Sequence, residues 1–233
     1  MEELNMSNNL EVLYEDNHII VVFKPINILS QSDITGDLDM LTIIKSYIKE
    51  KYNKPGNVYL GLVHRLDRVT SGIMVFAKTS KAASRLSNQI REKSFSKDYL
   101  AIIHGKIDSE GIYEDYLLKK DDFSTVVDKT GKYAKLSYKL LEYKESKDLS
   151  LVDVHLDTGR HHQIRVQFSS RGYPLLGDKR YGNDNYNELG LCAYKLSFTH
   201  PVTKELMEFI RFPKGSIWDF KYMEGDYYGK EEI

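Results

Sequence analysis

The chain has 233 residues, and its 33 Lys and Arg nearly balance its 34 Asp and Glu. The net charge of −1 excludes an overall basic signature for nucleic-acid binding, and the lack of a run of about 18 apolar residues excludes a membrane-spanning helix. The acidic N-terminus lacks the pattern of a signal peptide. The single cysteine, Cys192, excludes an internal disulfide, so we expect a cytoplasmic protein.

The first predicted elements are a hairpin and a helix. Residues 10–25 contain two apolar runs around a polar turn at 15–17, which is typical of a β-hairpin. Residues 39–52 place apolar side chains at helical spacing, with Asp39 as the expected N-cap.

Two apolar runs, 58–63 and 73–78, follow and enclose the polar stretch 64–72. They predict strands on either side of a turn. A second helix is expected over 80–93, with Ser80 as its cap.

The second half of the chain predicts mostly strands. We expect strands over 97–105, 133–143, 149–156, 192–201 and 204–210. Residues 161–172 fit a short helix ending at Gly172. Strands that follow one another between interspersed helices indicate an α+β fold with a mixed, mainly antiparallel sheet and flanking helices. One domain over 1–233 is the simplest expectation.

The stretch HRLDRVTSG, residues 64–72, carries more charge than a turn requires. It contains His64, Arg65, Asp67 and Arg68, whereas a turn needs only small polar residues and a glycine. Nearby positive charge favours an ionised carboxylate, so Asp67 is a candidate nucleophile or base. The alternative is a surface ion pair with no chemical role.

The stretch DTGRHHQIRVQ, residues 157–167, is the second polar cluster. Its polar side chains include Arg160, His161, His162, Gln163, Arg165 and Gln167. In one interpretation His161 and His162 bind a metal, with His64 or His155, but adjacent residues on a helix do not share a face and no metal-binding motif supports this. In the other, the cluster contacts a polyanion or a charged catalytic partner, which fits two arginines better.

Local charge supports a polyanion without deciding the matter. Residues 64–100 carry eight Lys and Arg against three acids, and residues 158–180 carry five against one. One face of the protein could therefore attract a polyanion, or these could be solvated charges on helix surfaces. Tyr99, on the predicted strand 97–105, would by itself be expected to serve packing.

Taken together, the motifs resemble the RluA-type RNA pseudouridine synthases. The matching segments are YEDNHIIVVFKP, HRLDRVTSG, KDYLAIIHG, LDTGRHHQIRVQFSSRGYPLLGDKRYG and LSFTHPVTKELMEF, in order over about residues 10–213. The resemblance implies a catalytic domain without the small N-terminal RNA-binding domain of many members. The loop 26–37 departs from the usual continuation of the first motif, so it could be specialised.

The resemblance also implies roles for particular residues. Asp67 matches the catalytic aspartate, and Arg65 matches an arginine that enters the RNA stack vacated by the target base. Tyr99 matches the active-site tyrosine implicated in moving the C5 proton, and Arg165 matches the arginine that pairs with the catalytic carboxylate. The remaining expected RNA contacts are His64, Arg68, Arg160, His162 and Gln163.

The implied function is the isomerisation of specific uridines in structured RNA, such as a tRNA arm or an rRNA hairpin, after the base is flipped out. The reaction is redox-neutral and uses no water, so we expect no metal or other cofactor. We also expect a monomer that needs no protein partner and no membrane. Two other functions stay open: a glycosidic hydrolase, which would need a second carboxylate about 5 Å from Asp67, and a non-catalytic RNA-binding module.

Overall fold

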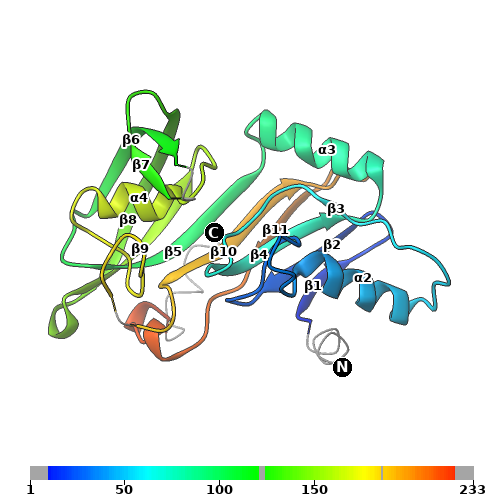
Figure 1. Cartoon of the computed structure of the whole chain (residues 1–233), viewed down its shortest axis with the longest axis horizontal. Helices are drawn as coiled ribbons and strands as arrows, with labels where there is room; N and C mark the ends of the chain where they lie inside the picture. Colours follow the sequence, from blue (N-terminus) through cyan, green and yellow to red (C-terminus); the bar gives the residue numbers. More distant parts are fainter. Residues whose placement is uncertain (1–9, 121–123, 185, 224–233) are drawn as a thin grey trace. The chain divides into compact units, whose positions relative to one another are not determined.

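The computed structural model describes residues 10–120, 124–184 and 186–223. The chain forms two compact units (Figure 1). Unit 1 comprises residues 1–96 and 193–211, and unit 2 comprises residues 97–192 and 212–233. Each unit is described by itself, and a single domain over 1–233 stays a prediction. Within the described residues, no helix is long and apolar enough to cross a membrane.

Unit 1 contains a sheet in the order β1-β2-β4-β10, with β11 pairing β10 and β3 pairing β4. Its strands are β1 (Val12–Glu15), β2 (Ile19–Lys24), β3 (Gly61–Leu62), β4 (Ser71–Ala77), β10 (Leu191–Thr199) and β11 (Leu206–Ile210). Its helices are α2 (Met40–Lys51) and α3 (Ser80–Arg91). The predicted 10–25 hairpin is confirmed as the antiparallel pair β1–β2. The final strand pair is confirmed as β10–β11.

The two helix caps of unit 1 differ in how well local sequence predicts them. The Asp39 side chain accepts hydrogen bonds from the backbone N–H groups of Leu41 and Thr42, as expected for the N-cap of α2. The expectation for Ser80 is wrong. Thr79 caps α3 and accepts from Ala82 N at 3.1 Å, and Ser80 is the first helical residue. Both residues can cap, so the pattern was correct to within one position.

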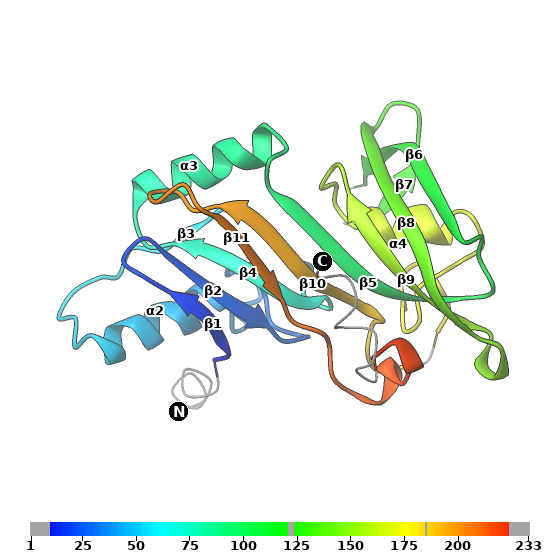
Figure 2. The ribbon, with the colours of Figure 1, turned by 180° about the vertical axis from the view of Figure 1, so that it is seen from behind.

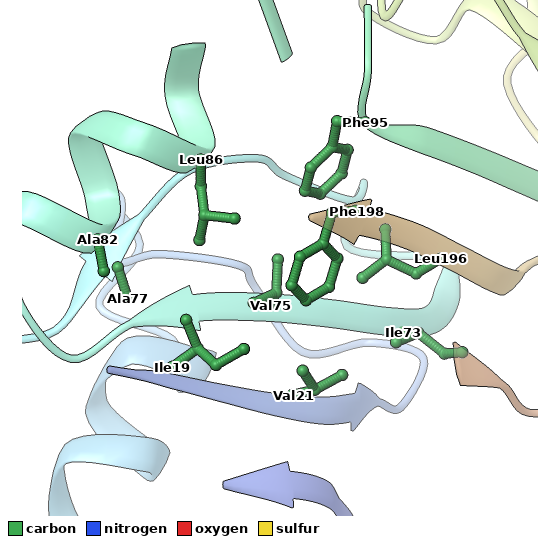
Figure 3. Close-up of a cluster of buried hydrophobic side chains, with 10 residues drawn as sticks. All are labelled: Ile19, Val21, Ile73, Val75, Ala77, Ala82, Leu86, Phe95, Leu196 and Phe198. Atoms are coloured by element: carbon green, nitrogen blue, oxygen red, sulfur yellow. The ribbon is translucent and has the colours of Figure 1, made fainter. Parts of the chain in front are cut away.

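One buried hydrophobic cluster of unit 1 lies between α3 and the sheet. Ala82 and Leu86 of α3 face buried side chains of β2 and β4 (Figure 3). Phe95 stacks on Phe198 of β10 with the ring centroids 5.7 Å apart. The remaining buried members of this cluster are Ile19, Val21, Ile73, Val75, Ala77 and Leu196. The packing leaves the end of β2 and the start of β4 fixed beside the 64–72 turn.

Unit 2 contains an antiparallel sheet in the order β5-β9-β8-β6-β7 (Figure 2). Its strands are β5 (Ser96–His104), β6 (Glu110–Lys119), β7 (Thr125–Val127), β8 (Lys132–Lys144) and β9 (Leu149–Leu156). Its helix is α4 (Gln163–Ser169), and short 3-10 turns occur at Glu145–Lys147, Ser216–Trp218 and Lys221–Met223. The predicted strands β5, β8 and β9 are confirmed. The strands β6 and β7 were not expected.

One face of the unit 2 sheet packs against α4. Phe168 of α4 makes edge contacts with Tyr113 and Tyr138, at centroid distances of 5.2 and 5.5 Å. Tyr138 pairs with Val154 of β9, which in turn pairs with Tyr99 of β5. Residues that pair across neighbouring strands project from the same face of the sheet, so Tyr99 lies on the face that α4 covers. The α+β fold with a mainly antiparallel sheet is confirmed.

Candidate active site

The turn that carries Asp67 is fixed by its backbone in unit 1. The Ser30 hydroxyl donates to Leu66 O at 2.7 Å and accepts from Leu66 N at 3.1 Å. On the other side of Asp67, the carbonyl of Arg68 accepts from Asn27 N at 2.8 Å. Ser30 and Asn27 both belong to the 26–37 loop. This loop therefore anchors the peptide groups before and after Asp67.

A buried lysine completes this anchoring. Lys24 has no exposed surface, and its Nζ donates to the carbonyls of Pro25, Ile28 and Arg68 at 2.9, 2.7 and 3.2 Å. Burial lowers the pKa of Lys24 to about 7, although the nearby Asp67 carboxylate opposes this. No sequence pattern indicated that this lysine would be buried.

The polar neighbours of Asp67 divide into one buried residue and two exposed ones. His64 is buried, accepts from Val75 N at 3.1 Å through Nε2, and packs on Phe95 at a centroid distance of 5.3 Å. This gives His64 a packing role, and its RNA contact stays a prediction. Arg65 and Arg68 are exposed. Arg68 pairs with Asp37 of the 26–37 loop at 2.5 Å.

Gly72 ends the turn because no other residue fits there. Its φ is +141°, and a Cβ built on it would lie 2.5 Å from Cβ and O of Ala193 in β10. A side chain would collide with the backbone of the neighbouring strand. The glycine of the motif therefore lets β10 approach the start of β4 closely.

In unit 2, the polar residues of 157–167 gather at the start of α4. His161 and His162 were expected on the helix, but they precede it, because His162 adopts a left-handed backbone with φ +52°. Their rings stack with centroids 3.7 Å apart. His161 Nδ1 contacts the Thr125 hydroxyl at 2.8 Å, and His162 Nδ1 contacts the Tyr181 hydroxyl at 2.6 Å. Within the described ranges no group of three or more His, Cys, Asp or Glu could hold a metal.

Arg165 is buried and oriented by a carboxylate of its own unit. Its Nε and Nη2 each donate to a different oxygen of Asp178 at 2.8 Å, in a bidentate pair. The guanidinium also lies over the Tyr181 ring, 5.0 Å from its centroid. Burial by itself would raise the pKa of Asp178, but Arg165 lowers it below its ordinary value. The pairing of Arg165 with Asp67, a residue of unit 1, stays a prediction.

Gln163 and Arg160 fix the loop before α4. The Gln163 side chain accepts from Thr158 Oγ1 at 2.8 Å and from Arg160 N at 3.0 Å, and donates to Lys135 O at 3.0 Å. Arg160 is exposed and donates to Tyr133 O at 2.8 Å. Gln163 is thus occupied by backbone and loop contacts, while the Arg160 side chain lies at the surface. Sequence reasoning did not single out Asp178 and Tyr181, which contact this cluster from outside the stretch 157–167.

The comparison with protein families decides the class of protein. The sequence profile of the RNA pseudouridylate synthases matches residues 18–170, which include both polar clusters. The chain belongs to the RNA pseudouridylate synthase family. It is therefore an enzyme, an RNA pseudouridine synthase that converts uridine in RNA to pseudouridine, as expected.

Curated relatives and solved structures agree with the family. This pseudouridine synthase is 35% identical over 210 residues to "Uncharacterized RNA pseudouridine synthase YlyB" of Bacillus subtilis (strain 168), covering 86% of the chain and 68% of the relative. It is 33% identical over 221 residues to "Ribosomal large subunit pseudouridine synthase C" of Buchnera aphidicola subsp. Schizaphis graminum, covering 88% and 67%. The structure of human RNA Pseudouridylate Synthase Domain Containing 4 shares the fold, with a TM-score of 0.77, 22% identity, and coverage of 91% and 93%.

Proposed function

We propose that this pseudouridine synthase isomerises specific uridines in structured ribosomal RNA, with Asp67 as its catalytic carboxylate. The observation that carries the proposal is the fixed backbone on both sides of Asp67, where Ser30 binds Leu66 and Lys24 binds Arg68. A surface ion pair would not need a buried lysine beneath it. Reacting groups, by contrast, gain from being held in one orientation.

To catalyse the reaction, the protein has to position the nucleotide and supply a charged side chain beside it. The N1–C1′ bond of the target uridine breaks, the uracil turns, and a C5–C1′ bond forms. The C5 proton is lost and N1 ends protonated, so atoms and electrons balance without water or a redox partner. An ionised Asp67 can act on the nucleotide as nucleophile or base. We propose that this chemistry runs in the monomer, without metal or other cofactor.

Unit 2 supplies the proposed partners of Asp67. Tyr99 stacks near the flipped base and takes part in moving the C5 proton. Arg165 pairs with the catalytic carboxylate and keeps it ionised. The bidentate contact with Asp178 supports this role, because it fixes the plane of the guanidinium before any substrate binds.

We propose that RNA is contacted by Arg65, Arg68, Arg160 and His162. Arg65 is exposed, so it can enter the stack where the target base has left, since a planar guanidinium stacks on bases and also contacts phosphate. His64 and Gln163 support these contacts through the packing and hydrogen bonds described above.

The substrate is proposed to be ribosomal, with tRNA as the alternative outcome. Curated relatives that the chain covers over two thirds of their length carry the name "Ribosomal large subunit pseudouridine synthase" C or D. The local basic stretches 64–100 and 158–180 also suit a compact RNA.

The central test compares wild type with Asp67→Asn on unmodified total RNA, with pseudouridines mapped site by site. We expect wild type to modify a small set of uridines in large-subunit rRNA, and Asp67→Asn to lose at least about a thousandfold in rate. Asp37→Asn, the same change at an exposed neighbour, is the control and should keep full activity. Activity of Asp67→Asn within about tenfold of wild type would remove Asp67 from the mechanism. Modification confined to tRNA would replace the proposed substrate.

A second test addresses base flipping by Arg65. Single-turnover rates of wild type and Arg65→Ala are compared on a hairpin with a stacked target uridine and on one with that uridine bulged. The loss should be larger on the stacked hairpin, because more extrusion work remains. Arg91→Ala, an exposed arginine on α3, is the matched control. An equal loss on both hairpins would assign Arg65 to binding instead.

A further inference from the structure

Lys97 is a partly buried cation in unit 2 that has no partner among the described residues of the chain. It lies on β5, two residues before Tyr99, so both side chains project from the same face of the sheet. Among the described residues, no acceptor or carboxylate contacts its ammonium group. Burial lowers the pKa of Lys97, and no nearby acid opposes this effect.

Three other cations of the chain that lie away from water have partners in the fold. A charge removed from water destabilises the folded state unless it is paired or hydrogen-bonded. Lys24 reaches three carbonyls, Lys78 pairs with Glu15 at 2.6 Å, and Arg165 pairs with Asp178. Lys97 is half-buried and has no such partner among the described residues. An anion that arrives from outside would supply the missing partner.

The loop above Lys97 leaves its ammonium uncovered. Gly159 lies in the 157–162 loop, and a Cβ built on it would be 3.5 Å from Lys97 Nζ. The position of this loop is fixed by Thr158. The Thr158 hydroxyl accepts a hydrogen bond from Lys135 N at 2.8 Å and donates one to Gln163 Oε1 at 2.8 Å. Glycine thus passes over the lysine without a side chain that could cover or neutralise it. The exposed Arg160 follows immediately.

We propose that Lys97 binds a backbone phosphate of the RNA, at or next to the nucleotide that Tyr99 receives. Phosphate is the anion that every RNA substrate presents, and a lysine binds it as a point charge. The proposal rests on the proposed function, because it places the phosphate beside the proposed active-site tyrosine. It adds a contact outside the polar clusters 64–72 and 157–167.

The first measurement separates a ligand-binding role from a structural one. Lys97→Met keeps the length of the side chain and removes the charge. If Lys97 binds a ligand and contributes nothing to folding, Lys97→Met should have a melting temperature equal to or above that of wild type. Lys139→Met is the matched control. Lys139 is exposed on β8 and lies opposite Asp153 of β9 in the strand register. Its side chain therefore projects from the face of the sheet opposite to that of Lys97.

The second measurement is RNA binding as a function of salt, with a fluorescein-labelled uridine-rich single strand as the probe. Its bases are already unstacked, so binding depends neither on flipping nor on a particular target. We expect Lys97→Met to bind about tenfold more weakly and to lower the slope of log K against log salt by about 0.7. Lys97→Arg should recover most of the affinity. Lys139→Met should change neither quantity.

Kinetics on the mapped RNA complete the test. A phosphate contact made before and during the reaction predicts a raised KM for Lys97→Met with a smaller change in kcat. Unchanged affinity and salt slope, together with a lower melting temperature, would overturn the proposal and make Lys97 structural. If no uridine is converted by wild type, the proposed function fails, yet the binding measurement still decides the role of Lys97.

Discussion

Each unit places a lysine at or below its surface, and the two lysines differ in what their ammonium groups contact. In unit 1, Lys24 has no exposed surface, and all three of its hydrogen bonds go to backbone carbonyls. In unit 2, Lys97 is partly buried and has no acceptor among the described residues. The same residue type thus fixes a backbone in one unit and is left available in the other.

This difference distinguishes a lysine that supports the fold from a lysine that can bind a ligand. A satisfied cation contributes to the fold, because its removal leaves acceptors without donors. A half-buried cation without a partner in the fold stays available to bind an anion from outside. The following predictions test whether this contrast holds, from the largest expected effect to the smallest.

The largest effect should come from breaking the satisfied pair of unit 2. Asp178→Asn leaves the Arg165 guanidinium, which is 7% exposed, without its carboxylate. We expect the free energy of unfolding in urea to fall by about 3–5 kcal/mol. Asp219→Asn is the control, since its contact with Lys144 is exposed and should contribute less than about 1 kcal/mol. A loss below about 1 kcal/mol for Asp178→Asn would show that Arg165 finds another partner.

Replacing Lys24 should lower the free energy of unfolding, whereas replacing Lys97 should not. Lys24→Met removes the ammonium that donates to the carbonyl of Ile28 and is a second donor to the carbonyl of Arg68, so we expect a loss of about 2–3 kcal/mol in unfolding free energy. Lys97→Met should cause no loss. Equal destabilisation by the two variants in parallel urea titrations would remove the contrast.

The pH dependence gives an independent check on Lys24. Its pKa in the folded state, lowered by burial to about 7, lies below the ordinary lysine value of about 10.4. Between these values the unfolded chain binds more protons, so this group makes stability rise with pH over that window. The difference in unfolding free energy between wild type and Lys24→Met should therefore change between about pH 7 and 10. A constant difference would mean that Lys24 stays fully protonated.

A smaller loss is expected from the acid that joins β1 to α2. Burial by itself would raise the pKa of Glu15, but hydrogen bonds from Lys51, Lys78 and Tyr52 lower it to about 2. The carboxylate therefore stabilises the fold above its unfolded pKa of about 4.3, and this contribution is lost as pH falls toward 2. Glu15→Gln should cost about 2 kcal/mol at pH 7 and flatten the acid side of the stability profile.

The control for Glu15 is Glu208→Gln, because Glu208 pairs with Lys195 at the surface and is 47% exposed. It should leave the acid side of the profile unchanged. The same slope in wild type and Glu15→Gln between pH 4.5 and 2 would place the acid-sensitive group elsewhere.

The smallest effect should come from the exposed pair between Arg68 and Asp37, whose side chains are 47% and 44% exposed. A double-mutant cycle with Arg68→Ala and Asp37→Ala should give a coupling free energy below about 1 kcal/mol. Arg68→Ala should still weaken RNA binding, since the proposed contact is with substrate. A coupling above about 2 kcal/mol would make the pair part of the fold.

Local patterns predicted most of the secondary structure because the signals lie within a few residues. The cap at Asp39 and the strand β9 follow from side chains that act on their own segment. The strand β6 was missed because only Tyr113 and Leu117 of its ten residues are buried. The inner face also carries Gly111 and Asp115, and the outer face exposes Ile112 and Tyr116, so apolar and polar residues do not alternate along the strand. Its pairing with β8, not its own pattern, makes it a strand.

The sequence by itself determined the family and nominated Asp67, Tyr99 and Arg165, because the motifs occur in order and contain these residues. It placed His161 and His162 on a helix, since nothing local revealed the left-handed backbone of His162. The partners that orient the nominated residues came only from the tertiary structure.

Lys24 and Lys97 show why the partners of a side chain depend on the tertiary structure. Each is one lysine within a strand, and neither neighbouring sequence tells whether carbonyls will surround the ammonium group. Carbonyls from Ile28 and Arg68 reach Lys24 because separate loops fold over it, whereas Gly159 passes over Lys97 without a side chain. The cost of a buried charge depends on what other segments bring to it, and only the folded chain decides that.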